Sequence, residues 1–251
     1  MNEILNIITI TKNDLEGLLS TIESTKKLRI KHNIHQIIVD SSTVEAQTKI
    51  KEFIINEHNI SYVWQEPSGI SSAFNLGLSL SKSEWIWFLN GGDQVHPEID
   101  TAHFLYIIEQ SKADAIIFDF ELMPSGIKPS HPPLWLLWPP LSAWIPHLST
   151  LTRRGLYDMY GKFNESYQIA MDFEFWLRCF SKHVLVDMLS IPIAKFDTNG
   201  RSYTNSTQTS QEAVSIIKKH LRNIFKIWFM NGVFIIKTSW NYLKHSKRSH
   251  Y

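Results

Sequence analysis

Short apolar segments alternate with amphipathic segments along the first half of the chain. Runs rich in β-branched and other apolar residues predict buried strands at Ile4–Thr11, Gln36–Asp40, Ser61–Gln65, Glu84–Asn90 and Ala115–Phe120. Apolar residues at helical spacing predict the intervening helices, namely one that begins after Asn13 or Asp14, then Thr43–Asn56, Ile70–Leu80 and Pro97–Ser111. Strands that alternate with helices through short connections predict an α/β domain, a three-layer sandwich with a mostly parallel central sheet.

The pattern becomes irregular in the second half. Residues 123–146 contain seven of the ten prolines, together with Trp135, Trp138 and Trp144, which predicts an ordered loop over an apolar surface. The remaining pattern predicts a strand at Leu148–Thr152, a helix at Phe173–Ser181, two short strands at His183–Met188 and Ile191–Phe196, and a polar loop at Asp197–Ser206.

The C-terminal segment combines helical periodicity with basic charge. Apolar side chains at helical spacing in residues 207–244 predict one or two amphipathic helices. Eight of the 25 Lys and Arg residues but none of the 24 acids follow Glu212, which leaves a net charge of −7 up to this residue and +8 beyond it. A basic amphipathic helix with aromatic side chains is typical of a membrane surface, and we favour this interpretation over packing against the domain.

Composition narrows the class of protein. Hydrophobic residues make up 43% of the 251 residues, enough to bury a sizeable core, and the net charge of +1 argues against a nucleic-acid binder. The single cysteine, Cys179, excludes an internal disulfide and a thiolate zinc cluster and fits a reducing compartment. The first residues lack signal-peptide features, and no apolar run reaches the ~18 residues of a membrane span. We therefore expect a cytoplasmic protein, peripheral at most on the inner face of the plasma membrane.

Several widespread nucleotide-binding and catalytic motifs are absent. The chain contains no G-x-x-x-x-G-K-[ST], no G-x-G-x-x-G after the first strand, no G-x-S-x-G and no H-E-x-x-H. A ligand that carries phosphate groups must then be held in another way, for example by a metal ion at a strand end.

Carboxylates follow three of the predicted strands. Asp40, Glu66 and Asp93 stand at or just after the ends of the second, third and fourth strands. Ligands of open parallel sheets bind outside the carboxyl ends of the strands, so these side chains are expected at one edge. Each alone has a plainer interpretation as a cap of a turn or helix, but three at one edge favour a site. Asp172, at the start of the Phe173–Ser181 helix, suits both a helix cap and a general base.

Two longer motifs point to a known family. From Glu66 to Asp93 the chain reads E-P-x-G-I-x-x-A-x-N-x-G and then F-L-N-x-G-D, and from Gly161 to Arg178 it reads G-x-F-N-E-x-Y and then D-F-x-x-W-L-R. With IITITKND and QIIVDSST before them, these motifs resemble the family 2 glycosyltransferases with the GT-A fold, closest to the bacterial polysaccharide subgroup. The resemblance covers about residues 4–206. It implies a GT-A domain at 1–206, with a nucleotide-sugar-binding half at 1–122 and an acceptor-side half at 123–206, followed by a basic amphipathic helical tail at 207–251.

The resemblance also implies an activity. A sugar would pass with inversion from a nucleotide-diphosphate donor, with a UDP-sugar favoured, to a glycan or lipid-linked acceptor in bacterial surface polysaccharide synthesis. Mg²⁺ or Mn²⁺ would be the cofactor, with Asp93 as its carboxylate ligand, Asp172 as the general base and Asp40 as the acid that contacts the nucleobase or ribose. The remaining residues that match the donor-binding parts of the family are Thr9, Thr11, Asn13, Glu66, Gly69, Asn75, Asn90 and Gly92.

Three further side chains have two interpretations each. His147 stands where the subgroup often has a histidine, so it either reaches the metal, diphosphate or acceptor or packs in the core. Arg178 either contacts the substrate or forms a salt bridge along its helix. Arg201 falls in the family's flexible loop over the diphosphate and is a candidate phosphate contact, because a guanidinium suits a phosphate.

The chain departs from the family pattern at several places, and other functions stay open. Asp93 is the only carboxylate of a metal motif that often has two, the second strand ends D-S-S-T, and Met171 stands where many members have Glu. These departures leave open a non-catalytic relative that binds a nucleotide sugar or a partner enzyme. A sugar-1-phosphate nucleotidylyltransferase is a further alternative, although residues 11–15 lack the Gly-rich basic loop that it needs.

Overall fold

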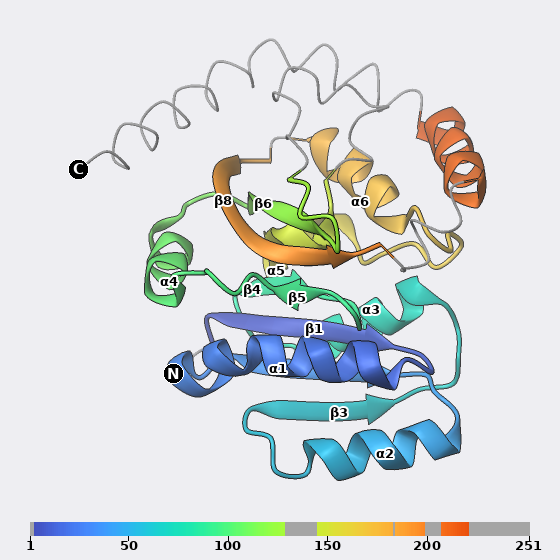
Figure 1. Cartoon of the computed structure of the whole chain (residues 1–251). Helices are drawn as coiled ribbons and strands as arrows, with labels where there is room; N and C mark the ends of the chain where they lie inside the picture. Colours follow the sequence, from blue (N-terminus) through green and yellow to red (C-terminus); the bar gives the residue numbers. More distant parts are fainter. Residues whose placement is uncertain (1–2, 129–144, 183, 199–206, 221–251) are drawn as a thin grey trace.

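A mixed β-sheet forms the centre of the protein (Figure 1). The computed structural model describes residues 3–128, 145–182, 184–198 and 207–220. Within these residues the sheet has eight strands in the order β3-β2-β1-β4-β7-β6-β8-β5. The strands are β1 (Leu5–Thr11), β2 (His35–Asp40), β3 (Ile60–Trp64), β4 (Trp85–Phe88), β5 (Gln94–Val95), β6 (Ala115–Met123), β7 (Thr150–Arg153) and β8 (Val186–Asp197).

Helices pack on both faces of this sheet. They are α1 (Leu15–His32), α2 (Val44–Ile54), α3 (Ile70–Leu80), α4 (Thr101–Gln110), α5 (Arg154–Tyr160) and α6 (Met171–Phe180), with a 3-10 turn η3 (His147–Ser149) before β7. Ile8 and Ile86 belong to a buried cluster with side chains of α3, α5 and α6. Their neighbours Ile7 and Trp87 belong to a second cluster with side chains of α1 and α4. Because successive side chains of a strand point to opposite faces, the two clusters confirm the three-layer sandwich.

The sheet is parallel in its first half and mixed in its second. β1 pairs in parallel with β2 and β4, and β2 pairs in parallel with β3. The register places Thr11 beside Asp40 and Asp40 beside Trp64, so the strands end together. β7 then runs antiparallel to both β4 and β6. The first half therefore has the expected parallel order, and the expected nucleotide-binding edge is the one where β1, β2 and β4 end.

Two residues of the first motif, Asn75 and Gly77, hold α3 in place, the first through the loop between α5 and α6 and the second through close packing on β1. Asn75 Nδ2 donates to the carbonyl of Phe163 at 2.9 Å, and Asn75 Oδ1 accepts from the Phe163 N–H at 3.0 Å. A Cβ at Gly77 would meet Cγ2 of Ile8 at 2.4 Å. Only a glycine lets the helix approach the strand this closely, because any side chain at this position would displace Ile8.

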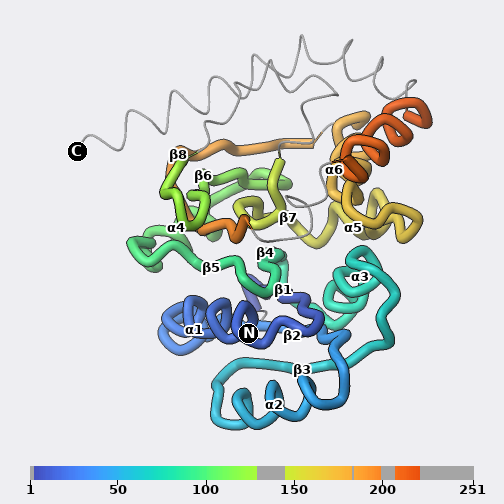
Figure 2. The backbone as a smooth tube through the Cα atoms, turned by 45° about the vertical axis from the view of Figure 1, so that its right-hand side comes forward, coloured from blue at the N-terminus to red at the C-terminus, as the bar shows by residue number. Residues whose placement is uncertain are grey.

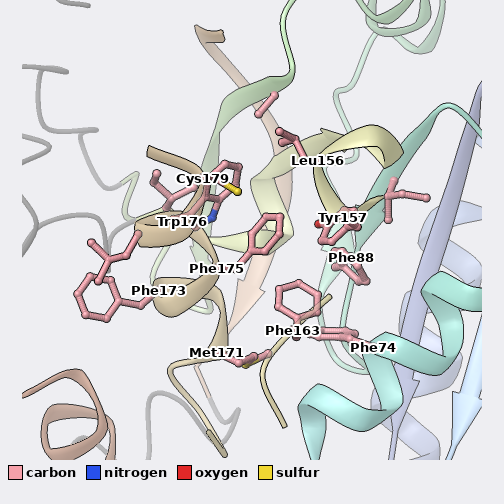
Figure 3. Packing of buried hydrophobic residues seen from close by; sticks show 14 of the residues in the cluster. Phe74, Phe88, Leu156, Tyr157, Phe163, Met171, Phe173, Phe175, Trp176 and Cys179 are labelled. Atoms are coloured by element: carbon pink, nitrogen blue, oxygen red, sulfur yellow. The ribbon is translucent and has the colours of Figure 1, made fainter. Parts of the chain in front are cut away.

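An aromatic cluster supports the second motif (Figure 3). Tyr157 of α5 stacks on Phe175 of α6 with 4.7 Å between ring centroids. Phe163 lies against Phe74, Phe88, Tyr157 and Phe175 with centroid distances of 5.4–5.8 Å. Paired aromatic rings add favourable contact energy beyond the area that they bury. The cluster therefore holds α6 firmly against the sheet.

The structure corrects some predicted elements. The two predicted strands at His183–Met188 and Ile191–Phe196 form one strand, β8, whose pairing with β6 shifts in register around Asp119. The shift is a bulge that interrupts the alternation of side chains, and the sequence pattern therefore looked like two strands. The short β5 and the seven-residue α5 were not predicted, since neither carries a full period of apolar residues. The three tryptophans of the Pro-rich segment lie outside the described residues.

The helix formed by residues 207–220 packs against α6 (Figure 2). Ile216 is fully buried in the cluster that contains α5 and α6, and Ala213 and Ile217 pack against that cluster. Up to His220, the segment therefore packs against the domain, the alternative that we favoured less. Residues 221–251 lie outside the description. No helix in the described part of the chain is both long and apolar enough to span a membrane.

We expect Ile216→Ala to lower the free energy of unfolding by about 2–4 kcal/mol, because it leaves a cavity between the helix and α6. Val214→Ala is the matched control, since Val214 is 50% exposed on the same helix. Urea denaturation followed by circular dichroism measures both variants. Equal losses of stability in the two variants would contradict the docking of this helix.

Candidate active site

Polar side chains meet where β1, β2 and β4 end. Asp40 is fully buried, and its two carboxylate oxygens accept hydrogen bonds from the Ser42 N–H at 2.8 Å and the Tyr62 hydroxyl at 2.7 Å. Asn13 joins the loops after β1 and β2, since its Oδ1 accepts from the Thr43 N–H at 2.9 Å. Burial and the Asp40 carboxylate raise the pKa of Tyr62 far above its ordinary value. This part of the edge is a rigid, hydrogen-bonded frame.

The turn after β4 carries the predicted metal ligand. Asp93 is 2% exposed, and its carboxylate accepts from the N–H of Asn90 at 3.2 Å and from the N–H of Asp197 at 3.1 Å. Gly92 has φ 101°, and a Cβ there would lie 2.7 Å from Oδ2 of Asp197. The turn therefore requires glycine at this position, both for its backbone conformation and for the close approach of β8.

Asp93 is electrostatically strained. Burial raises its pKa from the ordinary 3.8 to about 6, and the Asp197 carboxylate adds to this rise. Electrostatic interaction with His147 and hydrogen bonds from two backbone N–H groups lower the pKa of Asp93 but do not offset the effect of burial. A carboxylate that loses its water without gaining a full counter-charge favours the protonated form. A bound cation would relieve this penalty.

His147 connects the turn after β4 with α6. Nδ2 of Asn90 lies 2.9 Å from Nε2 of His147, and Nδ1 of His147 lies 3.5 Å from Oδ2 of Asp172. In this orientation the Asn90 amide nitrogen can only donate, so Nε2 acts as the acceptor and Nδ1, which faces Asp172, is the ring nitrogen available to carry a proton. Phe74 contacts the ring edge-on at a centroid distance of 5.5 Å. His147 therefore joins two candidate site residues that are far apart in sequence.

Asp172 is partly accessible at the start of α6. Its side chain is 24% exposed, and its Oδ1 accepts from the N–H of Phe173 at 2.7 Å. Oδ2 faces His147 and has no direct backbone donor among the hydrogen bonds of the described residues. A carboxylate with one oxygen held by the helix and the other beside a histidine is arranged to accept a proton from a bound hydroxyl.

Three predicted site residues have structural roles instead. Thr9 is fully buried, and its hydroxyl accepts from Gln36 Nε2 at 2.9 Å, because its side chain points into the layer between β1, β2 and α1. Asn75 is held by Phe163, as described above. Arg178 donates from Nε to both oxygens of Glu174 at 2.9 Å and from its other nitrogens to the carbonyls of residues 160–162. The salt-bridge interpretation of Arg178 therefore holds.

The remaining predicted residues lie at the rim or outside the description. Thr11 is 7% exposed, and its hydroxyl would lie 3.3 Å from a Cβ at Gly91 of the turn after β4. Glu66 and Gly69 are exposed on the loop between β3 and α3, and a Cβ at Gly69 would meet open space. Arg201 lies outside the described residues.

The donor chemistry at this edge fits a hard divalent cation shared with a diphosphate. Asp93 supplies a carboxylate and Asn90 an amide, and the Asn90 Oδ1 is buried without a hydrogen-bond partner in the described structure. Within the described ranges, no group of three or more His, Cys, Asp or Glu side chains could hold a metal. A cation here would take its remaining ligands from phosphate oxygens and water, as Mg²⁺ commonly does.

Sequence reasoning missed two acids at this site. Asp197, at the end of β8, lies against Asp93 and Gly92, although its position in the chain suggested only the start of a polar loop. Glu212 binds the backbone that leads into α6, although the sequence marked it only as the last acid before the basic tail. Neither contact has a signal in sequence spacing, because each depends on how β8 and the last described helix fold back.

The fold is that of the GT-A glycosyltransferases. S. aureus TarS 1–349 in complex with UDP-GlcNAc has a TM-score of 0.71 at 14% identity, covering 88% of this chain and 66% of that chain. The mannosyltransferase PcManGT from Pyrobaculum calidifontis, in complex with GDP-Man and Mn²⁺, has a TM-score of 0.64 at 13% identity, covering 100% of this chain and 77% of that chain.

Sequence comparison identifies the family. Residues 6–174 match Glycosyl transferase family 2, and the chain belongs to this family. This is the family that the sequence motifs resemble. A PGL/p-HBAD biosynthesis glycosyltransferase of Mycobacterium bovis is 27% identical over 143 residues, which cover 53% of this chain and 52% of the relative. The chain thus spans about half the length of the curated relatives that it matches over the longest stretch.

The raised pKa of Asp93 predicts how stability depends on pH. Because the folded protein binds this proton more tightly than the unfolded chain, the stabilisation is complete below pH ~4 and is lost as the pH rises through about 6. The difference between 3.8 and about 6 corresponds to about 3 kcal/mol. The free energy of unfolding of the wild type should fall by about this amount relative to Asp93→Asn between pH ~3 and ~7.

Urea denaturation in metal-free buffer across this pH range measures the difference between the two proteins, in which the titrating groups that do not interact with Asp93 cancel. A difference that stays constant with pH would show that Asp93 does not titrate abnormally.

Proposed function

We propose that the protein transfers a sugar with inversion from a UDP-sugar to a hydroxyl group of a glycan or lipid-linked acceptor in bacterial surface polysaccharide synthesis. The observation that carries this proposal is the pairing of His147 with Asp172 beside Asn90 and Asp93 at the edge where the parallel strands end. Ligands of parallel sheets bind at this edge. We favour UDP as the nucleotide of the donor. The structure of TarS, a protein of the same fold, in complex with UDP-GlcNAc supports this choice.

Asp172 acts as the general base in this proposal. Its Oδ2 takes the proton of the acceptor hydroxyl while the hydroxyl oxygen attacks the anomeric carbon. The bond between the anomeric carbon and the diphosphate oxygen breaks, and the nucleoside diphosphate leaves with the electron pair. His147 orients the carboxylate, since its Nδ1 faces Oδ2, and the Asn90 amide orients the ring from the other side.

The donor is held by the other half of the edge. Thr11, Asn13 and the turn from Asn90 to Asp93 border the nucleotide diphosphate, and the Asp40 frame keeps the loops after β1 and β2 in place. Asp93 and Asn90 would hold Mg²⁺ or Mn²⁺, which when bound neutralises charge on the diphosphate leaving group. Asp93 would gain from such a cation the counter-charge that its buried carboxylate lacks.

Calorimetric titration of UDP and GDP, each with and without Mn²⁺, tests the donor site. We expect UDP to bind with Mn²⁺ and the affinity to fall by at least about tenfold in Asp93→Ala, a loss of about 1.4 kcal/mol. Asp158→Ala is the control, because Asp158 is exposed on α5. Failure of both nucleotides to bind the folded wild type in the presence of Mn²⁺ would contradict the proposal and favour the non-catalytic relative.

Asp172→Asn tests the general base. Transfer should fall by about 10²–10⁴-fold, because the amide cannot accept the proton, while UDP affinity stays within about twofold. Release of UDP from a panel of UDP-sugars with isolated surface glycan as acceptor measures transfer, and Asp158→Asn serves as the control of equal charge. Turnover retained in Asp172→Asn would refute the assignment of the base.

A further inference from the structure

The carboxylate of Glu212 binds three successive backbone N–H groups. Its Oε1 accepts from Gln168 at 3.0 Å, and its Oε2 accepts from Ile169 and Ala170 at 2.9 Å each. Glu212 belongs to the helix of residues 207–220, more than 40 residues further along the chain. Three consecutive amides that converge on one carboxylate form an anion-binding concavity, and hydrogen bonds to a charged acceptor are strong ones.

These amides lead directly into α6. Ala170 is the N-cap of α6 and has no side chain that could cap the helix. The amides at a helix start lack partners within the helix and need acceptors from elsewhere. Asp172 follows Ala170 by two residues, so the carboxylate that caps this segment also fixes the backbone from which the proposed base projects.

The same helix contacts α6 at two more points. Ile216 is fully buried against the cluster of α5 and α6, and Nε2 of His220 lies 3.3 Å from Oε1 of Glu174. On the opposite side, the hydroxyl of Ser71 on α3 donates to the carbonyl of Tyr167 at 2.8 Å. The segment between Tyr167 and Asp172 is therefore held from two sides, by α3 and by the helix that carries Glu212.

We propose that Glu212 is a positioning residue for Asp172. This inference rests on the proposed function, since it assigns to the last described helix the task of holding the general base at its working distance. Removal of the carboxylate would leave three amides to seek water, and the start of α6 would loosen. A displacement of ~1 Å of a catalytic group can cost about 100-fold in rate.

The effect should be confined to the chemical step. The donor-binding candidates Thr11, Asn13 and Asp93 lie on β1, β4 and their loops, and none of their hydrogen bonds involves residues 207–220. We therefore expect Glu212→Ala to lower kcat for UDP release with acceptor by about 10- to 100-fold, with the UDP affinity within about twofold of wild type. Glu212→Gln keeps one acceptor oxygen, and its kcat should lie between the values of the wild type and Glu212→Ala.

Two controls separate positioning from general loss of structure. Gln211→Ala changes the exposed neighbour on the same helix, and Glu109→Gln removes an exposed acid from α4. Both should keep wild-type kcat. Hydrogen–deuterium exchange of the peptide that contains residues 168–172 gives a readout that does not depend on activity, and we expect faster exchange there in Glu212→Ala than in either control.

Unchanged exchange in Glu212→Ala, or a kcat within twofold of wild type, would overturn the inference. A kcat that falls in the same proportion as UDP affinity or as the folded fraction would overturn it as well, because the role would then be structural only. Absence of turnover in the folded wild type would instead contradict the proposed function, and the exchange measurement would then decide by itself whether Glu212 anchors the start of α6.

Discussion

The parallel pairing of β1 with β2 and β4 is the constraint on which the site depends. Parallel strands in register end at one edge, so the loops that follow Thr11, Asp40 and Phe88 lie next to one another. Two hydrogen bonds between Asn13 and the loop after β2 then lock these two loops together, one from the Asn13 N–H to the Ser42 hydroxyl and one from the Thr43 N–H to Asn13 Oδ1. The edge is thus prepared for a ligand by backbone geometry before any catalytic side chain is considered.

The second half of the chain brings the candidate catalytic side chains His147 and Asp172 to this edge. β7 runs antiparallel beside β4 and carries η3, so His147 reaches the turn that holds Asn90. The aromatic packing among Tyr157, Phe163 and Phe175 seats α6 against the sheet (Figure 3). Asp172, at the start of α6, lies on the other side of the same imidazole. His147 thus links the turn after β4, in the first half of the chain, with the start of α6, in the second half.

The family motifs turn out to combine two kinds of residue. Asn75, Gly77 and Arg178 hold α3, β1 and the turn at residues 160–162 together, and none of them faces the edge of the sheet in the contacts that they make. Asn90, Asp93 and Asp172 come from the same two motifs and do lie at the edge. Each motif therefore contains residues that stabilise the fold as well as residues that lie at the candidate site. The contacts of each residue show to which group it belongs.

The sequence by itself determined the parallel half of the sheet, the three layers and the strand ends that carry Asp40 and Asp93, because these depend on local periodicity and chain order. It also singled out His147 and Asp172 but left each with two interpretations. Only the tertiary structure decided that Thr9 is internal, that Arg178 is a structural clamp, and that Asp197 and Glu212 belong beside the site. Those outcomes depend on contacts between segments tens of residues apart, and the packing of β8 and the last described helix against the domain creates them.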